Sequence, residues 1–145
     1  MAYCSITDMR MLLPDTMLVN LSNDAAGAVI VHDVNIAESI DQADREIDSY
    51  LNIAGYTVPM TPIPLLVTNL SAKMAIWNLH LRKYFDSTIW RNTYLDCLRI
   101  LERIAEGKLT LGQETTGETQ TGANAGNHYV SSRTQKFSQT TWDEY

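Results

Sequence analysis

The sequence lacks several features that mark the large classes of protein. It has no run of 18 apolar residues, so we expect no transmembrane helix. Its first residues, MAYCSITDMR, contain no basic region followed by an apolar stretch, so we expect no secretory signal. The two cysteines, Cys4 and Cys97, have no motif spacing, and we expect free thiols in a reducing compartment.

Positive charge is also scarce. The 145 residues include 11 lysines and arginines against 17 acidic residues, a formal net charge of −6, and the basic residues do not cluster. A protein that binds nucleic acid usually carries a basic patch. The acidic balance instead favours protein partners, or a surface that must not adhere to DNA. We therefore expect no specific binding of DNA and no association with membranes.

Catalytic and cofactor-binding motifs are absent as well. The sequence contains no H-E-x-x-H, no glycine-rich phosphate loop after a strand and no G-x-S-x-G. The histidines have no acidic residue at metal-ligand spacing, and we expect His80 to be a partly exposed helix residue. These observations predict no enzyme activity, no catalytic residue, no metal and no cofactor.

One acidic cluster could still support chemistry. Asp41, Asp44 and Asp48 stand at positions i, i+3 and i+7 of a predicted helix, a spacing that could hold a metal ion or form an acid–base pair. Because the same helix has a clean apolar stripe elsewhere, we interpret these carboxylates as a face exposed to water. An acidic face at a subunit interface or in a channel lining is the alternative.

The hydrophobic pattern predicts an all-α fold, a compact bundle of about four helices. Hydroxyl residues at 5 and 7 and an acid at 8 predict a first helix over residues 8–13, which Pro14 ends. Residues 16–21 could form one more short turn. We expect a loop over residues 22–35, in which residues 28–31 are either a short strand or an apolar anchor.

The second helix has the strongest signal. Asn35 followed by Glu38 has the spacing of a capping box, and apolar residues then recur in one stripe as far as Ala54. Gly55 follows as a helix stop. A last helix is expected from Ser87 or Thr88 to about residue 106, with Gly107 as its stop.

The third helix, predicted over residues 64–84, has two apolar faces. A helix that is apolar on two sides must be covered on two sides, so it is a central helix, a subunit contact or both. We expect one of these faces to form a subunit interface: Leu65, Ala72, Ile76 and Leu79.

The composition changes after Leu111, which divides the chain into a helical domain (1–111) and a long extended C-terminal arm of low complexity (112–145). Residues 112–127 contain no apolar side chain larger than alanine and cannot bury enough surface to offset the ordering entropy. Large apolar residues then return singly, as in a docking arm; a loose C-terminal tail is the alternative. Its proposed anchors are Tyr129, Phe137, Trp142 and Tyr145.

The first 112 residues resemble a known family, the small neck proteins of Mu-like phages and prophages. The matching stretches keep their order and similar spacing. They are MAYC (1–4) with TDM (7–9), IDQADREIDSYL (40–51), Tyr56 with Val58-Pro59, PIPLL (62–66), YLDCLRIL (94–101) and IAEGKLTLG (104–112).

The resemblance implies a structural adaptor at the head-to-tail junction of a virion, assembled in the host cytoplasm. Such proteins are similar to connector subunits that form a ring, twelve-fold in the class, beneath the portal protein and beside other neck or tail-completion proteins. A C-terminal arm commonly docks on the portal. Genome DNA passes through the ring without specific binding, and we hypothesise that Glu38, Asp41 and Asp48 line or approach this channel, where they would repel phosphates.

Two other functions stay open at this point. The protein could be a different phage assembly part, such as a head-closure or tail-completion protein, but these tend to be rich in strands. It could also be a small helical regulator that binds a protein or DNA, although no basic or groove-reading helix is visible. A helix content near half of the chain would favour the adaptor.

Overall fold

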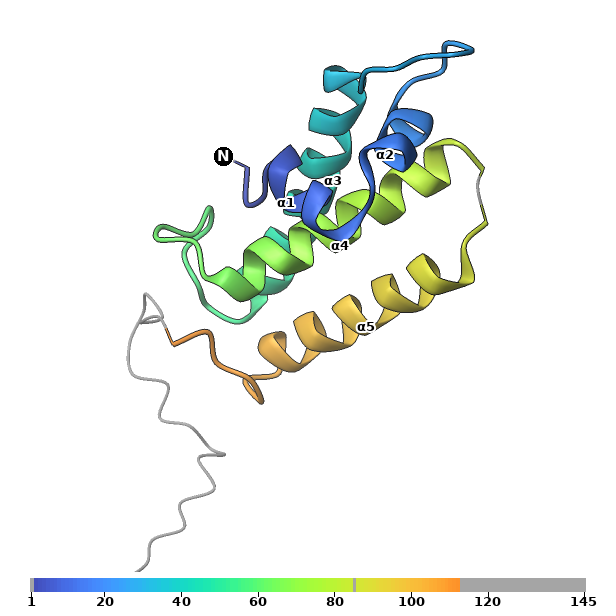
Figure 1. Ribbon diagram of the computed structural model, residues 1–145. Coiled ribbons are helices and arrows are strands. Elements are labelled where there is room, and N and C mark those ends of the chain that lie inside the picture. Colours follow the sequence, from blue (N-terminus) through green and yellow to red (C-terminus); the bar gives the residue numbers. More distant parts are fainter. Residues whose placement is uncertain (1, 85, 113–145) are drawn as a thin grey trace, which may run out of the picture.

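The computed structural model describes residues 2–84 and 86–112, and this part of the chain is helical, with no strand (Figure 1). The five helices are α1 (Ile6–Leu12), α2 (Asp15–Ser22), α3 (Asp33–Ile53), α4 (Leu65–Arg82) and α5 (Thr88–Ala105). The all-α prediction is therefore confirmed. The short turn expected at residues 16–21 is a helix of its own, and the strand considered for residues 28–31 is wrong.

Local side-chain chemistry sets the helix starts. Ser5 caps α1 in a capping box with Asp8, so α1 begins two residues earlier than predicted. The capping box predicted at Asn35 and Glu38 is wrong, because α3 begins at Asp33 and the ring of His32 accepts the Asn35 N–H at 3.3 Å. The Asn35 side chain instead donates to the Ser22 carbonyl at 2.6 Å.

The predicted glycine stops are confirmed. At the end of α3, Gly55 adopts φ 82°, its N–H donates to Asn52 O, and the Tyr56 N–H donates to Leu51 O. This pair of bonds is the Schellman arrangement, which needs a left-handed residue that glycine adopts without steric cost. Gly107, with φ 70°, ends α5 in the same way. The second stop turns the chain back so that the Leu111 N–H reaches the Tyr56 hydroxyl at 3.1 Å.

Helix α4 is the centre of the molecule, as its two apolar faces predict. It contacts each of the other four helices, and α3 and α5 run antiparallel to it while also contacting one another (Figure 1). Helices α1 and α2 cover another side of α4. None of the helices in residues 2–84 and 86–112 is long and apolar enough to span a membrane.

This central position corrects the predicted subunit interface. Ala72, Ile76 and Leu79 are buried inside the chain, with exposed fractions of 0–1%, because neighbouring helices cover that face of α4. They cannot form a surface for a second subunit. Of the predicted face only Leu65, at the start of α4, is exposed.

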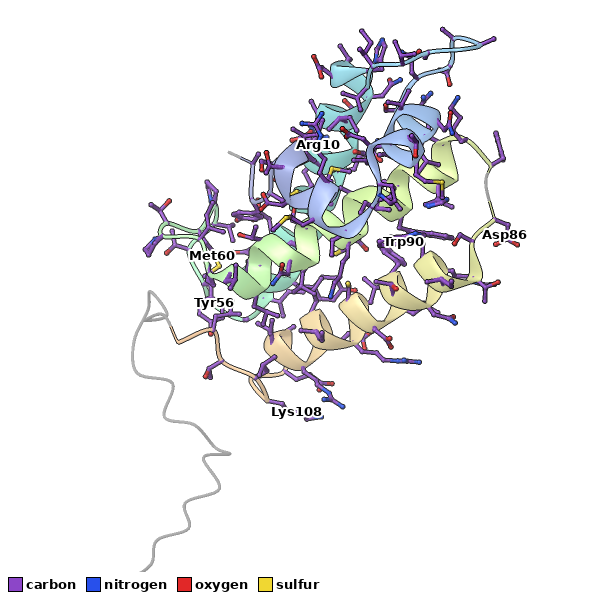
Figure 2. The ribbon with its side chains drawn as sticks, in the orientation of Figure 1. Arg10, Tyr56, Met60, Asp86, Trp90 and Lys108 are labelled. Atoms are coloured by element: carbon purple, nitrogen blue, oxygen red, sulfur yellow. The ribbon has the colours of Figure 1, made fainter. Side chains whose placement is uncertain are left out.

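His80 is also placed differently from the prediction. It is buried rather than partly exposed, and its ring lies 6.2 Å from that of Trp90, which projects from α5 toward α4 (Figure 2). The pair Trp77–Tyr94, with ring centroids 6.0 Å apart, packs the same two helices further along. Aromatic pairs of this kind contribute roughly 0.5–1.5 kcal/mol beyond their buried area.

Candidate functional site

The acidic residues of α3 do not converge on one site. Glu38 and Asp41 are exposed, and Asp41 pairs with Arg45 at 2.5 Å. Asp44, one turn further along, is buried and points into the core. Among residues 2–84 and 86–112 no group of three potential metal ligands comes together.

Asp44 is the centre of a buried polar network that we call the N-terminal tie (Tyr3, Asp44, Asp48, Met60 and Ser71). Its carboxylate accepts the Tyr3 N–H at 2.8 Å and the Ser71 hydroxyl at 2.5 Å. Burial raises the pKa of Asp44, and the hydrogen bonds from Ser71 and Tyr3 partly oppose that change. The tie therefore fixes the start of the chain to α3 and α4.

The Tyr3 ring completes the tie. Its hydroxyl donates to the Asp48 carboxylate and accepts the Met60 N–H at 3.0 Å. Burial, and then the bond to Asp48, raise the pKa of Tyr3. Figure 2 places Met60 and Tyr56 together on the connector between α3 and α4. The N-terminal tie thus joins four separate stretches of chain.

The expectation that all three aspartates face water is therefore wrong for Asp44, and Asp48 is half-buried. The sequence did contain a signal for Asp44. Counting from Ile40 by four, three and four residues gives Asp44, Ile47 and Leu51, so this carboxylate lies on the apolar stripe. Ser71 and Tyr3, which bind it, could not be assigned from local spacing.

Neither cysteine is placed as a nucleophile. Cys4 and Cys97 are both buried free thiols, and burial raises the pKa of each to about 11. A thiol must lose its proton to attack or to ligate a metal, and these thiols stay protonated near neutral pH.

A hydrogen bond between polar side chains also joins α3 to α5. The Tyr94 hydroxyl donates to Glu46 at 2.8 Å, and burial, followed by this bond, raises the pKa of Tyr94. These polar contacts thus join α3 to the N-terminal segment, to α4 and to α5.

Six exposed large apolar side chains belong to segments near one end of the bundle. These segments are the α2–α3 loop, the start of α3, the end of α4 and the start of α5, and in Figure 1 the loop projects well away from the start of α5. The exposed large apolar residues of this end are Val29, Ile30, Val34, Leu81, Tyr84 and Ile89. Val29 and Ile30 are adjacent in the chain on the projecting loop, and exposed apolar side chains grouped in this way suit an interaction surface.

The proposed anchors of the arm, Tyr129, Phe137, Trp142 and Tyr145, lie outside the described residues, as does most of the predicted 112–145 arm. Their role therefore stays a prediction. Residues 28–31, considered from the sequence as an apolar anchor, include two of these exposed side chains, and the others come from separate segments that local periodicity does not connect.

Comparison with known proteins identifies the family. The family model described as "Bacteriophage Mu, Gp36" matches residues 3–130, most of the chain. The Mu-like prophage FluMu protein gp36 of Haemophilus influenzae is 29% identical over 87 residues, which cover 60% of this chain. The same stretch spans 60% of the length of that relative. The chain belongs to the bacteriophage Mu Gp36 family.

Proposed function

We propose that this phage protein is a structural adaptor of the virion neck, which forms a ring beneath the portal and joins head to tail. The observation that carries the proposal is the exposed apolar pair Val29 and Ile30 on the α2–α3 loop of an all-helical bundle, in a chain of a phage Mu family. A ring subunit contacts its neighbours through two different surfaces and needs exposed apolar area for them. The five helices contain about half of the residues, which supports the adaptor over a strand-rich closure protein.

The proposed role is mechanical and not enzymatic. Asp44 binds Tyr3 and Ser71 in the core, and burial raises the pKa of both thiols, so these groups support the fold. The remaining alternatives are another assembly part, such as a head-closure or tail-completion protein, and a helical protein-binding regulator.

The deciding experiment is a pull-down and negative-stain imaging with the portal ring of the same phage. The full chain is compared with a truncation after Gly112. Binding by the full chain alone would support both the adaptor and the docking arm. Binding by both would support the adaptor and remove the arm from the proposal. Binding by neither would favour another neck part.

The arm carries its own test. Trp142 is its largest aromatic residue, and aromatic anchors often contribute about 2 kcal/mol or more to an interface. We expect Trp142→Ala to weaken portal binding roughly 30-fold, and Phe137→Ala and Tyr145→Ala to weaken it less. A Trp142→Ala protein that binds the portal as tightly as wild type would refute the arm.

The channel hypothesis is retained for Glu38 and Asp41, whose side chains are exposed, although Asp41 is paired with Arg45. Asp48 contributes charge from a half-buried position beside Tyr3. Twelve copies of an acidic face would repel the phosphates of passing DNA. An image of the assembled ring in which all three residues lie far from the axis would contradict this part of the proposal.

A further inference from the structure

The loop between α2 and α3 projects beyond the bundle as a narrow finger, which we define as residues 24–31 (Figure 1). After Asp24 its sequence is AAGAVIV, without any charge. Near the end of this stretch Val29 is 87% exposed and Ile30 is 71% exposed. Two adjacent β-branched apolar side chains held in water are a disadvantage to an isolated subunit and suit a contact surface.

The base of the finger is held firmly to the end of α4. The two terminal guanidinium nitrogens of Arg82 bind the Asp24 carboxylate, at 2.9 and 3.0 Å, and one of them also donates to Ser22 O at 2.8 Å. Lys83 adds an ion pair to Asp24 at 2.8 Å and a bond to Asn23 O at 2.7 Å. The carboxylate that begins the finger therefore has two cationic partners.

The segment that leads from the tip of the finger back to α3 is also held by hydrogen bonds. The Asn23 side-chain amide donates to Ile30 O at 3.1 Å, which ties the tip to the base, and the His32 N–H donates to the Ser22 hydroxyl at 3.1 Å. A loop ordered in advance loses less conformational entropy when it binds. The finger is thus a preorganised apolar projection.

A groove of about 630 Å³ lies between the finger and helices α1 and α2. Thr16, Val19 and Asn20 line its helix side, and residues 28–31 line its finger side. The two charged groups in its lining, Arg10 and Asp15, pair with each other at 2.8 Å. The groove therefore has no net charge, which suits an uncharged segment of chain. Its volume is in the range of sites that bind small ligands.

We propose that the finger of one copy lies in the groove of the next copy, between that copy's finger and its α2, so that the fingers overlap around the ring. This inference rests on the proposed ring. It joins two different surfaces of the same chain, which is the head-to-tail geometry that closes into rings. The stretch 25–31 and the groove both lack an unpaired charge, so the finger can enter the groove without burying one, whereas a contact with DNA would require free cations.

The test mixes two single-cysteine proteins, Ile30→Cys and Asn20→Cys, with the portal ring and then oxidises the assembly. Each copy carries one engineered thiol, so a disulfide between residues 30 and 20 can form only between copies. The native Cys4 and Cys97 are buried and do not compete. The control replaces Ile30→Cys by Ile53→Cys, because Ile53 is equally exposed at the opposite end of the bundle.

A disulfide between residues 30 and 20 in rings, absent from the Ile53→Cys mixture, is the expected result. Rings that give a 30–30 disulfide alone would show a two-fold contact and overturn the inference. Rings with neither product would also overturn it and leave the adaptor function standing, with the portal as the occupant to examine next. If no ring forms even with wild-type protein, both the inference and the proposed function fail.

A second pair of variants measures the contact without oxidation. Ile30→Lys and Ile53→Lys add the same charge at side chains that are 71% and 70% exposed, so neither should disturb folding. We expect Ile30→Lys to lower the fraction of protein assembled into rings roughly tenfold or more, and Ile53→Lys to leave that fraction unchanged. Equal behaviour of the two variants would overturn the inference.

Discussion

The N-terminal tie and the finger reverse the usual distribution of polar and apolar groups in opposite ways. The tie buries a carboxylate, Asp44, in the core, whereas the finger exposes Val29 and Ile30 to solvent. In both regions an aspartate accepts several hydrogen bonds. Asp44 is surrounded by core residues and binds neutral donors, while Asp24 lies at the surface and binds two cations.

The two networks have different roles in the fold. Burial raises the pKa of Asp44, so its charge costs free energy that the surrounding bonds offset. The bonds from Arg82, and then from Lys83, hold the pKa of Asp24 well below its usual range, so its charge stabilises the fold. The N-terminal tie joins separate parts of one subunit. The base of the finger instead holds an apolar tip in an exposed position, where a neighbouring subunit can contact it.

The largest expected effect is the loss of the buried carboxylate. Asp44→Ala leaves the Tyr3 N–H and the Ser71 hydroxyl without their acceptor inside the core, which should lower the free energy of unfolding by about 3 kcal/mol. Urea denaturation measures this change. The matched control is Asp41→Ala, on the same helix but exposed, with an expected change within about 0.5 kcal/mol. Similar losses in the two variants would contradict the structural role of the tie.

The N-terminal tie also shows which features of the fold the sequence could predict and which it could not. The extent of α3, its apolar stripe and the Gly55 stop followed from local periodicity and turn chemistry, which operate over a few residues. The partners of Asp44 lie 41 and 27 residues away in the chain, and no local pattern specifies such distances. The start of α3 was misplaced because a histidine, His32, serves as the cap in place of the more usual residue types.

An intermediate effect is expected at the base of the finger. Arg82→Met removes the bonds to Asp24 and to Ser22 O, which should cost about 1 kcal/mol and release the finger. Amide hydrogen exchange at residues 24–31 should accelerate more than exchange in α3. Arg99→Met is the control, since Arg99 also binds an aspartate but lies exposed on α5. Unchanged exchange in the finger would show that Arg82 does not order it.

The finger was the least predictable region for a physical reason. The run Ala28–Val29–Ile30–Val31 has the composition of a strand, and an apolar run normally indicates burial. Here the groups that hold the loop, Arg82 and Lys83, stand at the end of a helix some 60 residues later and attach only its base. Local periodicity has the same limit for α4. Its two apolar faces predicted that both sides are covered, but not whether the covering helices belong to the same chain or to another subunit.

The smallest effect, and the sharpest contrast, is in the pH dependence of the two aspartates. Asp24 has a lowered pKa in the folded protein, so it stabilises the fold above the unfolded value of about 3.9, and that contribution is lost as the pH falls through the folded pKa. Asp44 has a raised pKa, so between its unfolded and folded values the folded protein binds more protons, and stability falls as the pH rises through that window.

Urea denaturation of wild type, Asp24→Asn and Asp44→Asn from pH 3 to pH 7 separates these contributions. The advantage of wild type over Asp24→Asn should grow with increasing pH, because the variant lacks a carboxylate for Arg82 and Lys83 to bind. The advantage of wild type over Asp44→Asn should shrink over the same range, because the neutral amide avoids the cost of burying a charge. Parallel pH profiles for the two variants would mean that both carboxylates have the same environment, and the contrast between the N-terminal tie and the finger would not hold.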